Sequence, residues 1–386
     1  MKVKLGDIFE ISSGGTPSKS CPEYYGGDVP WVKTGDLKSE YIYGVADFIT
    51  EDGLRNSSAK MYEEDTVLMA MYGATIGATS ILKISACTNQ ACAAFRRNDK
   101  VIPEYLYYFL KSQKEKFVKD GVGGAQPNIS AGYLKKVEME LLLIKEQRIV
   151  VDILDKITNI INRRNQELIA LDELIKARFV EMFGDPKINE KRWNSGIISD
   201  YYEVKGGKRI PKGMGYSGEV TTHPYLRATD MKNETILDDD IHYIDDEVYE
   251  HIKKYIVKGG DIYLTNVGVN LGMAGVIPDK YDGANLTENA VKLVPKTEKI
   301  IDGRFLAHYI NSPGIQEYIN ERKMSVGVPK LAIFRIETMP LLLPPIDIQI
   351  QFVKLCNQVD KSKVAVQKAL DETQLLFDSL MQQYFG

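Results

Sequence analysis

Residues 149–184 read IVVDILDKITNIINRRNQELIALDELIKARFVEMFG, with no proline and with glycine only at the last position. A run of this length without a helix breaker predicts a single long helix. Its heptad residues recur at alternating steps of four and three, which is the spacing of a coiled coil. The heptad positions are Val150, Leu154, Ile157, Ile161, Arg164, Leu168, Leu171, Ile175, Arg178 and Met182. We therefore expect this helix to pair with another; the alternative is a long surface helix packed on its own domain.

A second helix at the end of the chain carries the same pattern. Its heptad positions are Phe352, Cys356, Val359, Lys363, Val366, Leu370, Thr373, Phe377, Leu380 and Tyr384. Across both helices, the residues expected to carry the pairing are Leu154, Ile157, Ile161, Leu168, Leu171, Ile175, Val359, Val366, Leu370 and Phe377. Two copies of one unit dock most simply about a twofold axis, which makes the helices antiparallel when the axis is perpendicular to them.

The duplication extends over the whole chain. LGDIFEISSGG from Leu5 aligns with ISDYYEVKGGK from Ile198, and WVKTGDL aligns with YLRATDM. TNQA at Thr88 aligns with TENA at Thr287. The offset between the copies grows from 193 (Ile198 against Leu5) to 202 (Gly386 against Gly184), and the order of the blocks never breaks. The chain is therefore two copies of one unit.

Each copy begins with a globular part and ends with the long helix. β-branched and aromatic runs broken by glycines, such as DTVLMAMYGATIGATSIL, predict strands, and PEYLYYFLKS predicts a short helix. The fold class is α+β, with two globular domains related by a pseudo-twofold axis and separated by an antiparallel coiled coil. The boundaries are 1–144 and 185–346 for the domains, with a linker at 185–195, and 145–184 and 347–386 for the helices.

Several classes of function are disfavoured by the composition and the motifs. No apolar run is long enough for a membrane span, and scattered cysteines fit a reduced, cytoplasmic protein. The four histidines all lie in the second copy, so catalysis by them would be absent from the first. We find no catalytic or metal-ligating constellation, and the acidic run near Asp238 is typical of a solvated face. The net charge of −4 argues only weakly against nucleic acid, because one basic face is sufficient for binding.

The loops of both globular parts carry short polar and basic side chains beside glycines. Residues 12–37, SSGGTPSKSCPEYYGGDVPWVKTGDL, lack the spacing of a nucleotide-binding loop. Such side chains instead suit base edges and phosphates. The candidates in the first copy are Thr16, Ser18, Lys19, Lys33, Thr34, Lys38, Tyr72, Thr75, Asn89, Gln90 and Gln126, with Trp31 packing behind them. Those in the second copy are Lys208, Arg209, Lys212, Arg227, Thr229, Lys232, Asn266, Asn270 and Lys330.

At this point the sequence resembles the specificity subunit of type I restriction-modification systems over its whole length. The motifs that carry the resemblance are SSGGTPSK…DVPWVKTGDL, MYGATIG, GGAQPNIS, LLLIKEQRIV, MFGDP and LMQQYFG, together with the duplication itself. Two departures concern the second copy, where Val328 and Lys330 replace Gln126 and Asn128. The loop GGKRIPKG also replaces GGTPSKS, which we interpret as different half-site chemistry.

The resemblance implies that each globular domain is a target-recognition domain that reads one half of a split, asymmetric site in double-stranded DNA. The helices would set the spacing and, through the pairing residues given above, dock two modification subunits. The chain would bind no cofactor and catalyse nothing. S-adenosylmethionine for adenine methylation, and ATP and Mg²⁺, would belong to the modification and restriction subunits. Two alternatives remain: an orphan or other-type restriction-modification specificity protein, and a coiled-coil scaffold that binds proteins and touches no DNA.

Overall fold

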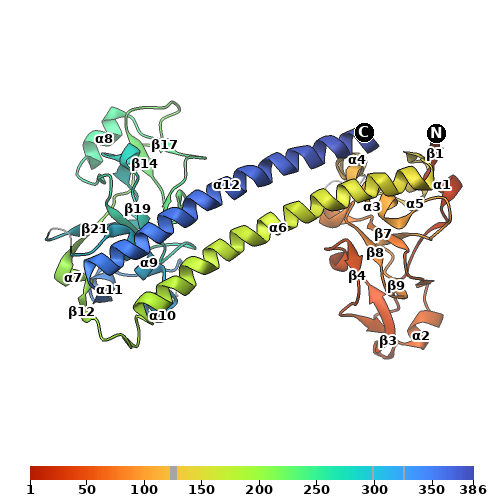
Figure 1. Ribbon diagram of the computed structural model, residues 1–386, viewed down its shortest axis with the longest axis horizontal. Coiled ribbons are helices and arrows are strands. Elements are labelled where there is room, and N and C mark those ends of the chain that lie inside the picture. Colours follow the sequence, from red (N-terminus) through yellow and green to blue (C-terminus); the bar gives the residue numbers. More distant parts are fainter. Residues whose placement is uncertain (122–127, 298–299, 325–326) are drawn as a thin grey trace. The chain divides into compact units, whose positions relative to one another are not determined.

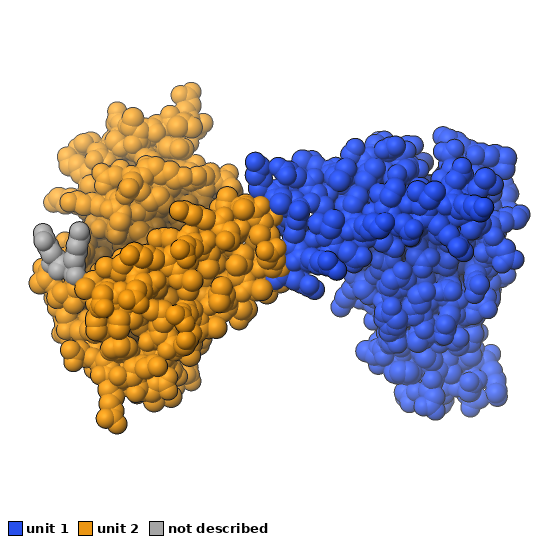
Figure 2. Space-filling view, in the orientation of Figure 1, with its two compact units in different colours: residues 1–166, 367–386 blue, residues 167–366 orange. Residues whose placement is uncertain are grey.

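The computed structural model describes residues 1–386 except 122–127, 298–299 and 325–326, so the candidate Gln126 lies outside the described residues. The chain forms two compact units (Figure 2). Unit 1 consists of two separate segments of the chain and unit 2 of one. Unit 1 contains residues 1–166 and 367–386, and unit 2 contains residues 167–366. Each long helix therefore contributes one part to unit 1 and another part to unit 2.

Unit 1 is built on two small sheets covered by short helices (Figure 1). The first sheet has the order β2-β10-β7-β8-β4, and the second has the order β5-β3-β9-β6. The strands are β2 (Ile11–Ser13), β3 (Tyr25–Val32), β4 (Tyr41–Ile42), β5 (Phe48–Ile49), β6 (Met61–Tyr62), β7 (Val67–Ala70), β8 (Thr79–Leu82), β9 (Ala86–Thr88) and β10 (Cys92–Phe95), with β1 (Lys2–Lys4) paired to β11 (Glu138–Glu140). The helices are α1 (Leu5–Ile8), α2 (Glu51–Arg55), α3 (Pro103–Ser112), α4 (Lys114–Asp120), α5 (Ala131–Leu134) and the first part of α6 (Ile144–Phe183).

Unit 2 repeats this plan with shorter outer strands. Its main sheet has the order β13-β21-β18-β19, and a second sheet has the order β17-β14-β20. The strands are β12 (Asn194–Ile197), β13 (Tyr202–Gly206), β14 (Pro224–Leu226), β15 (Met231–Lys232), β16 (Thr235–Ile236), β17 (His242–Tyr243), β18 (Ile262–Thr265), β19 (Ala274–Val276), β20 (Asn285–Leu286), β21 (Ala290–Pro295) and β22 (Pro340–Leu343). The helices are α7 (Ile198–Tyr201), α8 (Asp246–Ile252), α9 (Gly303–Asn311), α10 (Pro313–Arg322), α11 (Ile333–Glu337), the second part of α6 and the first part of α12 (Ile346–Phe385), whose last part belongs to unit 1. The mixed α+β fold expected from the sequence is confirmed.

Within each unit, the parts of α6 and α12 pack together. In unit 2 the Lys363 ammonium lies 2.5 Å from the Asp172 carboxylate, and the rings of Phe183 and Phe352 lie 5.5 Å apart. As the residue number increases along α6, the number of the contacting residue on α12 decreases, so the two parts are antiparallel. In unit 1 Arg164 donates to the backbone oxygen of Ala369. The predicted pairing of the long helices is confirmed inside each unit.

The C-terminal end of each long helix departs from the predicted heptad. Arg178 is exposed, and the buried side chains are instead Phe179 and Phe183. In the second copy Met381 and Phe385 are buried in the same way. The buried residues Ile175, Phe179 and Phe183 follow one another at steps of four. Because one turn holds about 3.6 residues, such steps shift the apolar stripe around the helix. The turned stripe faces the globular core of its own unit, where Phe183 meets Phe305 of α9 and Phe385 meets Tyr105 of α3.

The N-terminal end of each long helix is fixed by a fully buried glutamine. Gln147 accepts from the Ile102 N–H at 3.0 Å, and Gln349 accepts from the Asp302 N–H at 2.9 Å. The amide nitrogens donate to Lys100 and Leu142 in the first copy and to Ile300 and Pro344 in the second. Both glutamines therefore tie the start of a long helix to the segment that begins α3 or α9. This pair of glutamines was not predicted from the sequence, although Gln349 follows Gln147 by 202 residues, the same offset as between Gly386 and Gly184.

Candidate nucleic-acid interface

Four segments of unit 1, together with the chain at Ile129, are joined by backbone hydrogen bonds and carry most of the candidate residues. The bonds run from Gly15 N to Thr88 O (2.8 Å), from Asn89 N to Val32 O (3.0 Å), from Met71 N to Ala91 O (2.8 Å) and from Ile129 N to Met71 O (3.0 Å). They bring together the Gly-Gly loop, the end of β3, the loop after β7 and the loop between β9 and β10. Residues far apart in the chain thus form one surface, which we call the loop platform.

Unit 2 builds the same platform with four equivalent bonds. They run from Lys208 N to Leu286 O (2.8 Å), from Thr287 N to Leu226 O (3.0 Å), from Asn266 N to Asn289 O (3.0 Å) and from Leu331 N to Asn266 O (2.9 Å). These bonds correct the sequence alignment by one residue, because Asn89 corresponds to Thr287 and Gln90 to Glu288. The matching residues of TNQA and TENA led to the wrong alignment. The register is set by backbone hydrogen bonds, which do not depend on which side chains match.

The Gly-Gly loop of each platform lies close to the neighbouring strand. A Cβ added at Gly14 would collide with the carbonyl oxygen of Thr88, and one added at Gly207 would collide with that of Thr287. Glycine is therefore required by close approach at this position in both copies. A buried aromatic side chain holds the loop from behind. Trp31 donates from its indole nitrogen to the Gly15 oxygen at 3.1 Å, and the Tyr225 hydroxyl donates to the Lys208 oxygen at 2.9 Å.

The basic residue after this aromatic is held by carboxylates in both copies. The Lys33 ammonium lies 2.7 Å from Asp47 and 5.0 Å from the centre of the Trp31 ring. Its backbone N–H donates to Asp36 at 2.8 Å. Lys33 therefore has an ion-pair partner in Asp47 and an aromatic neighbour in Trp31, and both side chains of the ion pair stay partly exposed to solvent.

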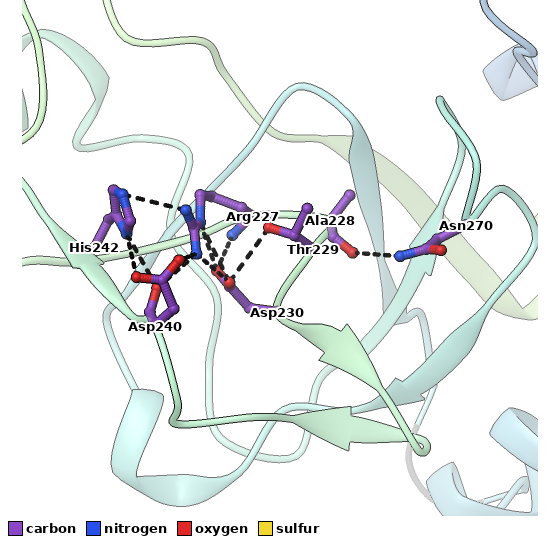
Figure 3. A network of polar contacts seen from close by, with 7 residues as sticks. All are labelled: Arg227, Ala228, Thr229, Asp230, Asp240, His242 and Asn270. Carbon is purple, nitrogen blue, oxygen red and sulfur yellow. Dashed lines mark hydrogen bonds and ion pairs between the residues drawn. The ribbon is translucent and has the colours of Figure 1, made fainter. Parts of the chain in front are cut away.

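Arg227 is the equivalent residue in unit 2 and is held more tightly (Figure 3). Its guanidinium lies 2.7 Å from Asp230 and 2.9 Å from Asp240, and His242 lies 3.2 Å from another of its nitrogens. The hydrogen bond with Asp230 and the one with Asp240 raise the pKa of Arg227, and Arg227 lowers the pKa of Asp240 below its usual range. These partners take up most of the guanidinium N–H groups, and a contact of Arg227 with DNA stays a prediction.

Thr16 and its structural counterpart Arg209 meet the corrected partners across the platform. Thr16 donates to the side chain of Gln90, and Arg209 forms an ion pair with Glu288. Burial raises the pKa of Glu288, but the hydrogen bond from Arg209 and further local interactions outweigh it, so the net shift is downward. The two copies therefore use one geometry with a neutral pair in unit 1 and a charged pair in unit 2.

The glycine-bounded loop after β7 or β18 also has one backbone shape in both copies. Gly73 and Gly77 have φ of 66° and 80°, and their counterparts Gly268 and Gly272 have 101° and 94°. This left-handed backbone favours glycine. The side chains differ. Tyr72 is exposed, whereas Val267 takes its place in unit 2.

The remaining candidates divide by exposure. Asn266 is buried and donates to the Leu331 oxygen at 3.4 Å, and Asn270 donates to the Ala228 oxygen at 3.3 Å (Figure 3). Half-buried candidates are Thr16, Lys33, Thr34, Thr75, Asn89, Arg227 and Asn270. Exposed candidates are Ser18, Lys19, Lys38, Tyr72, Gln90, Lys208, Arg209, Lys212, Thr229, Lys232 and Lys330. The exposed group is accessible to a ligand, with Gln90 and Arg209 also paired across the platform, while Asn266 is buried in the protein.

The helix residues expected to pair are turned away from solvent. Leu154, Ile157, Ile175, Val359 and Phe377 are buried. Ile161, Leu168, Leu171, Val366 and Leu370 are half-buried. A partner cannot reach the buried ones without opening the helix pair. The sequence analysis did not single out the apolar side chains that these helices leave exposed, which include Ile169, Leu174, Val364 and Leu375.

Two other kinds of site are absent from the described residues. No group of three or more His, Cys, Asp or Glu side chains there could hold a metal ion. None of the described helices is both long enough and apolar enough to cross a membrane.

The chain is similar to known proteins over most of its length. The family described as "Type I restriction modification DNA specificity domain" matches residues 1–170 and 190–373. The type I restriction enzyme MjaIX specificity subunit of Methanocaldococcus jannaschii is 27% identical, with 98% of this chain and 90% of that protein covered. The EcoR124I/EcoR124II specificity subunit of Escherichia coli is 26% identical over 41% of each chain.

Solved structures show the same fold. The S subunit of a type I restriction-modification system from M. genitalium has a TM-score of 0.56 at 16% identity, with 100% of this chain and 96% of that chain covered. A chain from a structure on complex assembly and conformational transition of a type I restriction-modification system has a TM-score of 0.68 at 14% identity, with coverage of 100% and 97%.

Proposed function

The chain belongs to the family of type I restriction-modification DNA specificity proteins, and from that membership we propose that its two loop platforms read the two halves of one split DNA site. Its role is DNA sequence specificity. One observation carries the proposal: the same backbone framework is built twice, with four equivalent hydrogen bonds, but its exposed side chains differ. A conserved framework with changed side chains is what two readers of different base sequences require.

The chemistry of each platform supports different half-sites. Unit 1 presents neutral groups such as Thr16, Gln90 and Tyr72, together with Lys19. Unit 2 presents Lys208, Arg209 and Lys212 from the equivalent loop. Arginine and lysine favour guanine edges and phosphates, whereas glutamine and asparagine favour adenine. We keep the recognition-domain boundaries 1–144 and 185–346 as part of this proposal.

The long helices are proposed to set the spacing of the half-sites and to dock two modification subunits. Support comes from the helices themselves, because α6 and α12 each contribute to both units and expose apolar side chains such as Leu174 and Leu375. Exposed apolar side chains that gather into one patch mark a protein contact surface.

The chain is proposed to be the non-catalytic part of its complex. Recognition lies on this chain, while the modification subunits would bring S-adenosylmethionine and methylate adenine. Restriction subunits, which would use ATP and Mg²⁺, complete the nuclease. We place the complex in the cytoplasm, where its DNA lies.

An exchange of one domain tests this division of labour. Residues 1–144 are replaced by the equivalent domain of another specificity subunit, and the methylated sequence is read in a host that carries the modification subunit. We expect one half of the methylated sequence to change while the other half stays the same. A change in both halves, or in neither, would contradict the proposal.

A further inference from the structure

A hollow lined by lysines lies beside the loop platform of unit 2. Its volume is about 360 Å³, and its walls include Lys205, Lys254, Tyr255 and Lys292. The Tyr255 oxygen accepts from the Leu286 N–H at 2.8 Å, and Leu286 in turn accepts from the Lys208 N–H at 2.8 Å. The hollow therefore shares a wall with the Gly-Gly loop of the platform. None of its wall lysines was a candidate in the sequence analysis.

The strand register places two of these lysines directly opposite each other. Lys205 on β13 pairs with Lys292 on β21 in the antiparallel ladder. Like charges at opposed positions destabilise a sheet. Local carboxylates offset part of this cost, because Glu203 lies 2.8 Å from Lys205 and Asp261 lies 3.2 Å from Lys292.

The charge of the hollow remains positive after these pairs are counted. Lys254 adds a third ammonium group to its wall, and the Lys208 ammonium lies 5.7 Å from the centre of the Tyr255 ring. The three wall lysines and the nearby Lys208 thus outnumber Glu203 and Asp261, the two carboxylates that pair with Lys205 and Lys292. A hollow of this charge suits an anion, and lysine binds phosphate as a point charge.

Unit 1 has no charge at the positions equivalent to the three wall lysines, and Lys60 takes the place of Tyr255. The ladder pair there is Ser12 with Ala94. The bridge from Ile256 to Asn285 matches the pairing of Met61 with Cys87, so Ala59 corresponds to Lys254. The lysines are therefore not needed by the fold that the two copies share.

We propose that this hollow binds a backbone phosphate of the DNA strand whose bases face the platform of unit 2. The inference rests on the proposed function, which brings DNA to that platform. A phosphate contact adds affinity without sequence information. Unit 2 is accordingly the more salt-sensitive of the two readers, since each neutralised phosphate releases counterions.

The test compares variants that carry the residues of unit 1. Lys205→Ser with Lys254→Ala removes two charges and leaves the Lys292–Asp261 pair intact. A second variant, Lys292→Ala with Asp261→Thr, removes both members of that buried pair and so leaves no lone charge. The control, Lys187→Ala with Lys296→Ala, removes two charges elsewhere in unit 2. Affinity for the methylated site and for a scrambled duplex is measured in the complex with the modification subunit, from about 50 to about 200 mM salt.

We expect Lys205→Ser with Lys254→Ala to reduce the slope of log affinity against log salt by about one per lost phosphate contact, on both duplexes. The methylated sequence should stay the same. A slope equal to that of the control would overturn the inference. A parent complex that does not distinguish its site from the scrambled duplex would instead contradict the proposed function, and a slope change on both duplexes would then still support the hollow as a phosphate site.

A second arm separates DNA from small anions. Inorganic phosphate is titrated into the chain without DNA, and binding is followed by calorimetry. Tight phosphate binding that Lys205→Ser with Lys254→Ala abolishes, together with an unchanged salt slope on DNA, would assign a free anion and overturn the DNA assignment. Weak or absent phosphate binding with a changed slope supports it.

Discussion

Arg227 and Lys33 occupy equivalent positions in the two copies, but the carboxylates that pair with them differ in burial. Each follows a buried aromatic residue, and each donates its backbone N–H to an aspartate three residues later at 2.8 Å. The Asp230 side chain is only 4% exposed, whereas Asp47, the partner of the Lys33 ammonium, is 45% exposed. The basic residue thus pairs with a buried carboxylate in unit 2 and with an exposed one in unit 1.

Replacement of these two residues by alanine should therefore have unequal effects. Arg227→Ala leaves the buried Asp230 without its cation, and we expect the free energy of unfolding to fall by about 2–4 kcal/mol. Lys33→Ala removes an exposed pair and should cost about 0–1 kcal/mol. Urea unfolding of the two variants measures the difference. Equal losses would mean that Arg227 does not anchor its platform.

The sequence predicted the aromatic residue, the basic residue and the nearby aspartate in both copies. It did not predict Asp47 and Asp240 as partners, because these approach through strand pairing and carry no local pattern. For the same reason it misaligned Asn89 and Gln90 by one residue. Backbone register is decided by hydrogen bonds between distant strands, which matching letters do not report.

The long helices are the elements in which sequence and structure agree best. Their heptads run through many turns, so a periodic pattern fixes both the helix and the face that pairs. The agreement ends where the globular core takes over, at Phe179 and Phe183. There the side chains pack against α9 and not only against the other helix, and a two-helix pattern has no means of anticipating that contact.

At the other end of each helix, Gln147 and Gln349 are expected to be essential for stability. Each satisfies three backbone groups, and a buried group left without a partner costs about 1–3 kcal/mol. We therefore expect Gln147→Ala and Gln349→Ala each to lower the free energy of unfolding by at least about 2 kcal/mol. The matched control is Gln351→Ala, an exposed glutamine on α12, which should change it by less than about 0.5 kcal/mol. Denaturant titration of the three variants makes the comparison, and similar values for all three would show that the buried bonds carry no stability.

For the whole molecule, the net charge of −4 limits what the chain does alone. Only local patches, such as the lysine hollow, offer positive charge to DNA. We expect the isolated chain to bind DNA weakly, at the level of about 10⁻⁴–10⁻⁶ M typical of non-specific contacts, with strong salt dependence. Addition of the modification subunit should convert this to tight, specific binding. A gel-shift series at physiological salt decides the matter, and nanomolar specific binding by the chain alone would refute this expectation.

The duplication was visible in the sequence because the aligned blocks keep one order. The exposed side chains that distinguish the copies were visible too, but not which bases they contact. That depends on how DNA docks and on its shape at bases the protein never touches.

Methylome sequencing tests most directly whether the two loop platforms of this chain read two different DNA half-sites. A host expressing this chain with its cognate modification subunit should carry adenine methylation at a single motif made of two unlike parts, divided by an unspecified spacer of constant length. Methylation at one uninterrupted motif, or at two identical half-sites, would contradict the claim.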